Sequence, residues 1–366
     1  MKRARGLKIL LVILLVLILC GVALLLFLTV REYRPQPREE LEISEGAAVM
    51  AAPSVGDSIT LISFNTGYGC QDKDHDSRAD GGKMENKRAE RYVKQNIAGI
   101  ADILQREDAD ICLLQEVDRD SKRSFYVNQE DYYKEQMMEY YSSYAYNYKC
   151  DYIPYPWPPT GQVRAGIMTM SKYPVRSSVR ISLPCPFKWP QKTCQLKRCL
   201  MMQHIPLQGT DKELVVINLH LEAYDNGKGK TAQTRMLYKV LMEEYLKGNY
   251  CIAGGDFNQS FENVDPMLYP LNITSHFMPG MLTLEGLDGE WTLANDPEVP
   301  TSRLLNEPFD PESSNTQYYV IDGYVVSPNI RVEQVETLDE GFGYTDHNPV
   351  KLKVTLLEEE GDKNDF

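Results

Sequence analysis

The residues of this chain best suited to catalysis follow short apolar runs. Runs such as Ile59–Phe64 and Ile111–Leu114 combine apolar and β-branched residues and are typical of strands. A polar residue placed directly after such a strand is held by the strand while its head group can reach a cleft. Eight residues share this setting or lie beside it: Asn65, Glu116, His220, Asp256, Asn258, Asp322, Asp346 and His347.

Glu116 and Asn65 are candidate metal ligands. Hard cations such as Mg²⁺ or Mn²⁺ prefer carboxylate and amide oxygens, and a metal helps a weak nucleophile attack an anionic phosphoester. Taken alone, a glutamate at a strand end is more often solvated, and an asparagine shortly before Gly67 commonly starts a turn. The metal prediction therefore depends on the whole set of residues.

Asp256, Asn258 and His347 have side chains that can activate and position water. Gly254 and Gly255 precede Asp256 and let the backbone turn sharply. The Asp256 carboxylate can then orient or deprotonate water, and the Asn258 amide can hold a phosphate oxygen. The imidazole of His347 titrates near neutral pH and needs a partner that fixes its tautomer. Gly-Asp turns and loop histidines are common, so these residues too gain meaning only together.

In chain order, the motifs resemble the signature of the endonuclease/exonuclease/phosphatase superfamily. The resemblance covers about residues 59–357. It implies a four-layer α/β sandwich of two packed mixed β-sheets, with the active site at the edge where strand ends converge. The motifs are Asn65, Gln115-Glu116, Asn218-Leu219-His220, Gly255-Asp256-Phe257-Asn258, Ile321-Asp322 and Asp346-His347-Asn348-Pro349.

The resemblance also implies a role for each remaining residue. Asp322 would pair with His347 as a carboxylate–histidine dyad, and Asp346 would lie on the metal or water side. His220 would donate to a phosphate oxygen or protonate the leaving group, and Asn218 would support the phosphate-binding side of the site.

The expected activity is divalent-metal-dependent phosphoester hydrolysis by attack of water on phosphorus. Asp256 and His347 are expected to activate the water jointly, with the His347–Asp322 dyad favoured as the base. The substrate stays open between nucleic acid, a phospholipid headgroup and a small phosphoester, so a nuclease, a sphingomyelinase-like phosphodiesterase and a phosphatase are all candidates. The alternative class is a non-catalytic binding module that retained the fold. Such a module predicts the loss of a chemical residue, and all eight are present.

The charge of the chain limits how it can contact a substrate. Its 366 residues carry a formal net charge of −13, so the surface as a whole repels phosphate polymers. This argues against tight, non-specific nucleic-acid binding through a broad basic face. Four arginines lie in or after motif-bearing segments and are candidates for phosphate contacts: Arg119, Arg123, Arg164 and Arg198.

The N-terminus forms a separate unit. Four basic residues within positions 1–8 precede the uncharged stretch Ile9–Val30, which is long enough to span a bilayer as a helix. A cleaved signal peptide is the rival interpretation, but it has a shorter apolar region and a small-residue cleavage site. The basic residues favour a cytoplasmic N-terminus. We therefore expect a monomeric, single-pass cell-membrane protein with its catalytic domain outside the cytoplasm.

The chain is expected to contain five segments and few helices. They are a basic cytoplasmic segment (1–8), an anchor (9–30), a Pro- and Glu-rich tether (31–57), the catalytic domain (58–357) and an acidic tail (358–366). Apolar periodicity predicts helices over 86–106 and 231–247. Ala165–Met170 and Val175–Ile181 are expected to form a hairpin.

Three further features leave alternatives open. Tyr126–Tyr155 holds ten of the 23 tyrosines and precedes Pro156-Trp157-Pro158-Pro159, so this stretch could line a cleft, meet lipid headgroups or pack at a core edge. The loop Gly69–Gly82 is rich in aspartate and could bind a second cation or form a solvated rim. Finally, a disulfide in an exported domain and free thiols are both open for Cys185, Cys194 and Cys199.

Overall fold

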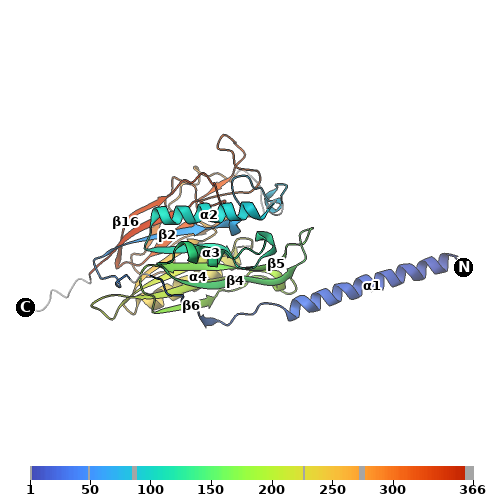
Figure 1. Ribbon diagram of the computed structural model, residues 1–366, viewed down its shortest axis with the longest axis horizontal. Coiled ribbons are helices and arrows are strands. Elements are labelled where there is room, and N and C mark those ends of the chain that lie inside the picture. Colours follow the sequence, from blue (N-terminus) through green and yellow to red (C-terminus); the bar gives the residue numbers. More distant parts are fainter. Residues whose placement is uncertain (1, 48–49, 85–88, 226, 272–276, 359–366) are drawn as a thin grey trace, which may run out of the picture.

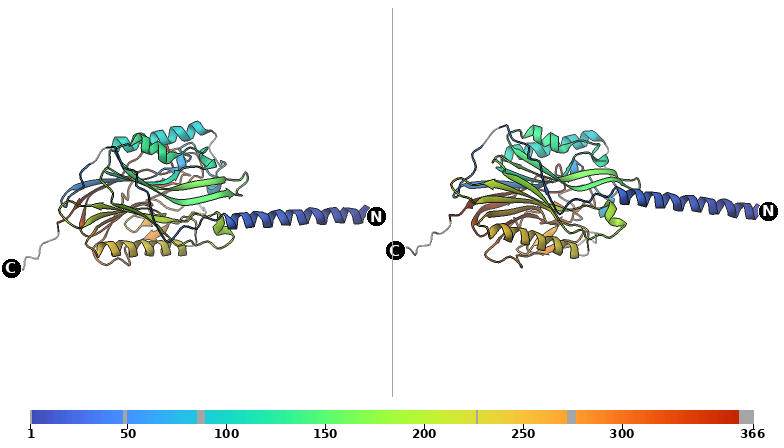
Figure 2. Two further views of the ribbon diagram at one scale, coloured as in Figure 1. Left: turned by 60° about the horizontal axis from the view of Figure 1, so that its bottom comes forward. Right: turned by 90° about the horizontal axis from the view of Figure 1, so that it is seen from below.

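Two large β-sheets and one long N-terminal helix make up most of the structure, a computed structural model that describes residues 2–47, 50–84, 89–225, 227–271 and 277–358 (Figure 1). The helix α1 (Lys2–Val30) projects away from one end of the body. The sheets pack against each other, and shorter helices lie on their outer sides (Figure 2).

The first sheet has six strands in the order β16-β17-β2-β3-β5-β4. Neighbouring strands are antiparallel except β2 and β3, which are parallel. The central strands are buried along nearly their whole length, as expected for apolar runs covered on both faces. The strands are β2 (Ser58–Asn65), β3 (Ile111–Asp118), β4 (Tyr141–Ile153), β5 (Gly161–Ser171), β16 (Ile330–Thr337) and β17 (Val350–Leu356).

The second sheet has seven strands in the order β1-β6-β7-β8-β9-β15-β12. Here β8 and β9 form the parallel pair. The strands are β1 (Arg38–Glu40), β6 (Ser177–Ser182), β7 (Cys199–Pro206), β8 (Glu213–His220), β9 (Tyr250–Asp256), β12 (Thr292–Ala294) and β15 (Asp322–Val326). Two short pairs lie outside the large sheets: β10 (Gln259–Phe261) with β11 (Gly280–Leu282), and β13 (Ser302–Arg303) with β14 (Tyr318–Tyr319).

Three apolar layers hold the sandwich together. The inner layer lies between the sheets, where Leu61 and Leu352 of one sheet share a core with Val216 and Ile252 of the other. Each sheet also has an outer layer of apolar contacts with helices. The helices are α2 (Glu90–Glu107) and α3 (Gln129–Gln136) on the six-stranded sheet, and α4 (Lys228–Tyr245) on the seven-stranded sheet. The predicted four-layer α/β sandwich with two mixed sheets is confirmed.

The expected hairpin between Ala165 and Ile181 is wrong. β5 pairs with β3 and β4, whereas β6 pairs with β7 and β1 in the other sheet. The connection at 172–176 therefore crosses from one sheet to the other. The sequence pattern could not reveal this, because alternation predicts a strand but does not specify its neighbour.

The segment 31–57, expected to be a flexible tether, is held in part by backbone pairing with the folded domain. Arg38–Glu40 pairs with β6 as an edge strand of the seven-stranded sheet, and Ser44 forms a bridge with Ser142. The side chain of Glu32 lies against Lys197. Backbone pairing thus fixes a stretch that offers few apolar residues for packing. The acidic tail after residue 358 lies outside the described residues, and so does His276.

The strand registers bring the polar strand ends to one edge. Asn65 is level with Gln115 in the parallel pair β2 and β3. In the other sheet, His220, Asp256 and Asp322 are level on three adjacent strands. Because the carboxyl ends of both parallel pairs lie at the same side of the sandwich, their end residues face a shared space.

Candidate active site

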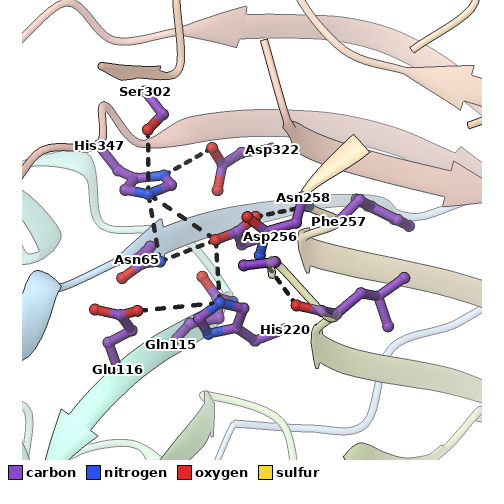
Figure 3. Close-up of polar contacts among 12 residues, drawn as sticks. Asn65, Gln115, Glu116, His220, Asp256, Phe257, Asn258, Ser302, Asp322 and His347 are labelled. Atoms are coloured by element: carbon purple, nitrogen blue, oxygen red, sulfur yellow. Dashed lines mark hydrogen bonds and ion pairs between the residues drawn. The ribbon is translucent and has the colours of Figure 1, made fainter. Parts of the chain in front are cut away.

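Residues from both sheets and from the loop before β17 surround one small cavity (Figure 3). Its volume is about 150 Å³. Seven of the eight candidate catalytic and metal-binding residues line it. The eighth, Asp322, does not line the cavity but contacts the lining residue His347. A larger cavity of about 460 Å³ lies beside α4 and contains none of them. Chemical groups, not size, therefore mark the small cavity as the candidate site.

His347 and Asp322 form a buried ion pair. The His347 Nδ1 lies 2.9 Å from Asp322 Oδ2, which fixes the ring orientation. The opposite nitrogen, Nε2, is 3.4 Å from Asn65 Nδ2 and 3.3 Å from Ser302 Oγ. Burial alone would lower the pKa of His347, but the charge and hydrogen bond of Asp322 outweigh it and raise the pKa to about 10. The imidazole is therefore held in its protonated form.

Asp256 lies at the centre of the cluster. Its Oδ2 accepts a hydrogen bond from Asn65 Nδ2 at 3.0 Å, and its Oδ1 accepts one from the Asn258 backbone N–H at 2.8 Å. His220 Nε2 is 3.3 Å and His347 Nε2 is 3.9 Å from Oδ2. Burial, and next the nearby Asp322 carboxylate, raise the pKa of Asp256. A buried aspartate of raised pKa is a stronger base than a solvated one.

A β-bulge aims Glu116 into the cavity. The pairing between β3 and β5 shifts register between Leu114 and Val117, and Glu116 adopts a left-handed backbone with φ 57°. Its Oε1 lies 4.0 Å from His220 Nε2. Its Oε2 is buried and has no hydrogen-bond partner within the described part of the chain. Burial, and next the neighbouring Asp346, raise the pKa of Glu116 to about 7.

The donor set around Glu116 fits a hard divalent cation. Glu116 and Asp346 both line the cavity: the charge of Asp346 helps to raise the pKa of Glu116, and burial raises the pKa of Asp346. The free oxygen of Glu116 is a ready ligand. A cation between the two would compensate both charges, and oxygen ligands of this kind suit Mg²⁺ or Mn²⁺.

A second group, Asp256, Asp322 and His347, also has donor atoms within 4.8 Å of one another. Here, however, Asp322 Oδ2 is joined to His347 Nδ1 by a hydrogen bond, and only Asp322 Oδ1 has no partner among the described residues. A protonated imidazole also cannot bind a metal through either nitrogen. We therefore regard these three residues as an acid–base cluster and the Glu116 side as the metal side.

His220 is a neutral imidazole. Burial, and next the charge of Arg198, lower the pKa of His220 well below its ordinary value. Its Nε2 faces Asp256, while its Nδ1 is buried without a hydrogen-bond partner in the described ranges. A neutral ring between two carboxylates can donate one hydrogen bond to a phosphate oxygen or to Asp256.

Comparison with known proteins agrees with this geometry. A sequence model of the Endonuclease/Exonuclease/phosphatase family matches residues 62–347. The chain belongs to this family. Its members are phosphoester hydrolases, and membership supports that general activity here. No curated protein sequence matches the chain.

Solved structures of this family share the fold. An endonuclease/exonuclease/phosphatase from Beutenbergia cavernae is 16% identical over 82% of this chain and 72% of its own, with a TM-score of 0.58. ANGEL2, a 2′,3′-cyclic phosphatase solved with adenosine-2′,3′-vanadate, is 14% identical over 87% of this chain and 99% of its own, with a TM-score of 0.52. An endonuclease/exonuclease/phosphatase from Bacteroides vulgatus is 16% identical over 82% of this chain and 99% of its own, with a TM-score of 0.50. At these identities, the likeness shows the fold alone.

Two of the predicted residues have different contacts from those expected of a family site. Asn218 does not reach the cavity: its amide bonds to Leu114 O, Met168 O and Gln115 Nε2 between the two sheets. It was expected beside the phosphate and instead joins the sheets that carry the site. Asn65, expected as an oxygen ligand, turns its amide nitrogen to Asp256 and His347, while its oxygen accepts from Gly67 N at 3.1 Å.

The structure also distinguishes among the four arginines. Arg198 lines the cavity, with its Nε 4.0 Å from Glu222 Oε2 and its Nη1 donating to His220 O at 3.3 Å. The other three are engaged elsewhere: Arg119 pairs with Glu130, Arg123 with Asp118, and Arg164 with Asp151. Only Arg198 among the four is therefore placed to contact a phosphate.

Several cavity residues gave no signal in the sequence. Tyr68 lines the cavity beside Glu116, and Ser302 contacts His347. Arg303 and Tyr224 also line the cavity. These four residues lie in a three-residue 3-10 helix, a loop or a two-residue strand, where no apolar run in the sequence indicates them. The aspartate-rich loop 69–82 reaches the cavity through Gln71 and Asp80.

Proposed function

We propose that this chain is a divalent-metal-dependent phosphoester hydrolase held on a membrane by α1, with its catalytic domain outside the cytoplasm. One observation carries the proposal. A single cavity holds an ionised His347–Asp322 pair, the basic carboxylate of Asp256 and an unpartnered, buried Glu116 oxygen. A proton donor, a base and a candidate metal ligand thus lie in one cavity.

The proposed metal site uses Glu116 and Asp346, with the second lone pair of the Asn65 oxygen as a further donor. When bound, a divalent cation would supply positive charge to a phosphate oxygen and so favour attack on phosphorus. This local charge would also overcome the repulsion expected from a chain of net charge −13.

The residues of the cavity then divide the remaining work. Asp256, whose raised pKa makes it the better base, takes the proton from the attacking water. The His347 imidazolium donates to the phosphate and stabilises the charge that develops there, with Asp322 keeping it protonated. His220 and the Asn258 amide donate to further phosphate oxygens. This assigns water activation to Asp256 more than to His347.

The N-terminal helix supports the membrane part of the proposal. Arg5–Val30 is long and apolar enough to cross a bilayer, a property that a signal sequence can share. The base of α1 packs on the folded domain, where Leu28 is buried. A helix built into the domain surface favours an anchor that stays with the mature protein. The non-catalytic alternative has no support, since each chemical residue is present, with seven of the eight buried and Glu116 half-buried.

A substrate panel tests the proposal. The full chain, purified in detergent, is given bis-p-nitrophenyl phosphate, plasmid DNA, sphingomyelin, anionic phospholipids and inositol phosphates, each with Mg²⁺ or with a chelator. We expect turnover of at least one substrate that the chelator abolishes. Turnover that ignores the chelator would remove the metal from the mechanism, and failure on every phosphoester would contradict the proposed activity.

A further inference from the structure

The base of α1 is seated against the end of β4 and the segment before β7. Leu28 is buried against Cys150, Ile153 and Cys194. Thr29 Oγ1 accepts a hydrogen bond from Trp189 Nε1 at 3.0 Å. Figures 1 and 2 show the hairpin that joins β4 to β5 reaching out on the side from which the helix leaves. Two loops adjoin this seat: residues 154–160 follow β4 directly at the tip of that hairpin, and residues 184–197 precede β7 and include Trp189 and Cys194.

Charged contacts fix the chain just beyond the helix to β4 and to the loop 184–197. Arg31 pairs with Asp151 on β4, close to the hairpin loop in the sequence. Lys197 Nζ lies 3.0 Å from Glu32 Oε1. Side-chain contacts therefore set the position of the helix end relative to the end of β4, where the hairpin loop begins, and to the loop 184–197. We call loops 154–160 and 184–197 the collar.

The collar exposes large aromatic side chains. Trp157 is 82% exposed, Trp189 is 56% exposed and Tyr155 is 48% exposed. The third tryptophan of the chain, Trp291, is 5% exposed in the core beside α4. Amphipathic aromatic rings are favoured at the headgroup level of a bilayer, where one end can be apolar and the other hydrated.

The collar is also basic in an otherwise acidic protein. Loop 184–197 contains Lys188, Lys192 and Lys197 and no acidic residue, although the whole chain has a net charge of −13. Lys197 is paired with Glu32, which leaves Lys188 and Lys192 as the lysines for a bilayer contact. Lysines near an anionic bilayer are attracted to its negative surface. Aromatic and basic residues thus occur together at the level where α1 would leave a membrane.

We infer that the collar is a second membrane contact, which docks on the headgroup layer of an anionic phospholipid bilayer around the base of α1. The occupant is fixed by continuity, because a helix that spans a bilayer brings the loops at its base to the bilayer surface. The inference rests on the proposed spanning role of α1, and it does not rest on catalysis.

Docking of the collar would face the active site towards the membrane. Leu196 and Arg198, at the end of the second loop, line the active-site cavity. The strands that end at the cavity, β3 and β8, end on the same side as the hairpin tip and the start of β7. The site would therefore act on phosphoesters presented at the bilayer surface, and phospholipid headgroups become the favoured substrates among those left open.

Tryptophan quenching tests the docking. The full chain is reconstituted into liposomes of phosphatidylcholine with phosphatidylglycerol, with or without phosphatidylcholine brominated near the headgroup end of its acyl chains. We expect bromine to quench the wild-type emission. A W157F/W189F double variant retains only the buried Trp291 and should lose this quenching. Turnover of a soluble phosphodiester should be the same in both proteins, since neither tryptophan lies in the cavity.

Charge variants test the preference for anionic lipid. K188E/K192E should lose the part of the quenching that phosphatidylglycerol adds, whereas K353E, an exposed lysine on β17, should retain it. Flotation with the liposomes shows whether α1 is inserted. An inserted wild-type protein without quenching overturns the inference, and so does quenching that the double variant keeps. A protein that does not float with the liposomes instead removes the anchor from the proposed function.

A different observation points to a modification site under the collar. Cys150 and Cys194 lie in one small apolar cluster with Leu28. Both sulfurs approach the same carbonyl oxygen, that of Tyr152, at 3.6 and 3.8 Å, and the Cys150 Sγ is also 3.9 Å from Thr193 O. Cys185 is exposed and Cys199 is buried beside Tyr146 O. Neither belongs to the apolar cluster that contains Cys150 and Cys194.

The geometry points to a disulfide between Cys150 and Cys194 in the exported protein, joining β4 to the short helix η4 (Gln191–Cys194). The two thiols would lose two electrons and two protons to the disulfide of a thiol oxidoreductase, which becomes a dithiol. The bond would link both halves of the seat of α1.

Alkylation of the full chain tests this bond. Protein isolated from membranes is denatured and alkylated with and without prior reduction, then mapped by mass spectrometry. We expect all eight cysteines to react after reduction, and Cys150 and Cys194 to remain unlabelled and cross-linked without it. Full labelling without reduction, or a link to Cys185 or Cys199, overturns the assignment.

Discussion

At the scale of single residues, the site depends on two opposite electrostatic environments a few ångströms apart. Asp322 stabilises a proton on His347, whereas burial and Arg198 keep His220 neutral. Two histidines of the same ordinary pKa thus acquire different protonation states. This difference gives each ring its own task, one as a charged donor and the other as a neutral one.

His347→Ala should lower turnover by about 10²–10⁴-fold, as expected when a positioned acid–base group is lost. The fold should remain, because the ring packs at the cavity and not in an apolar core layer. His204→Ala is the matched control: it removes another buried imidazole, paired with Glu213 at 2.8 Å and remote from the cavity. Steady-state kinetics with circular dichroism would measure both. An unchanged rate for the His347 variant would take this residue out of the site.

Glu116→Gln should chiefly raise the Mg²⁺ concentration needed for half-maximal activity, because the amide keeps the shape but loses the charge of the ligand. Glu262→Gln, an exposed glutamate, serves as the control for charge removal. Metal titrations of the rate measure the effect. Equal metal affinity in both variants and the wild type would mean that Glu116 is not a ligand.

At the scale of the elements, the backbone brings the site together at two special positions. One is the bulge that aims Glu116. The other is Gly255, where β9 approaches β8 so closely that a Cβ would lie 2.0 Å from Leu219 O. The site residue Asp256 comes directly after it. Any side chain at 255 must therefore push apart the strands that carry Asp256 and His220.

Gly255→Ala should lower the free energy of unfolding by about 3 kcal/mol or more, since backbone must move to relieve the clash. Gly209 also has a positive φ, of 77°, but an added Cβ meets nothing within 4 Å. Gly209→Ala should therefore cost only about 1 kcal/mol, the price of the left-handed backbone alone. Urea unfolding of the full chain in detergent compares the two. Equal losses would contradict the close approach of the strands.

The sequence predicted the elements better than their partners. Apolar runs identified strands ending at Asn65, Glu116, His220 and Asp256, because burial requires such runs. The run after Ala165 could not show that β5 and β6 belong to different sheets. The sequence pattern also did not indicate the bulge at Glu116, because the bulge arises from the way β3 pairs with β5.

The site was predictable where strands carry it and not where loops do. Ser302 and Arg303 approach His347 and the cavity only because β13 pairs with β14 and bridges to His347. Asn218 looked like a site residue but is engaged between the sheets. Chain order cannot separate a residue that faces the cavity from one that faces the other sheet.

At the scale of the whole molecule, the base of α1 and the catalytic edge lie at the same end. The helix α1 is seated on the hairpin of β4 and β5, and the strands of the first sheet that carry the site end beside that hairpin (Figure 1). If α1 spans a membrane as we propose, the site meets its substrates at or near the bilayer.

Added protease should digest the domain in right-side-out membrane vesicles and leave it intact in inside-out ones, if the basic N-terminus stays in the cytoplasm. Immunoblotting of the C-terminal domain reads the outcome, with detergent-lysed vesicles as the digestion control. Protection in right-side-out vesicles alone would reverse the proposed orientation.

The central claim is that one cavity performs metal-dependent phosphoester hydrolysis. The most direct measurement is turnover of bis-p-nitrophenyl phosphate by the full chain after chelation and again after Mg²⁺ is restored, beside the His347→Ala variant. Wild-type activity should disappear with chelation and return with Mg²⁺, while the variant should stay near background throughout. Wild-type turnover that persists without metal, or full turnover by the variant, would contradict the account.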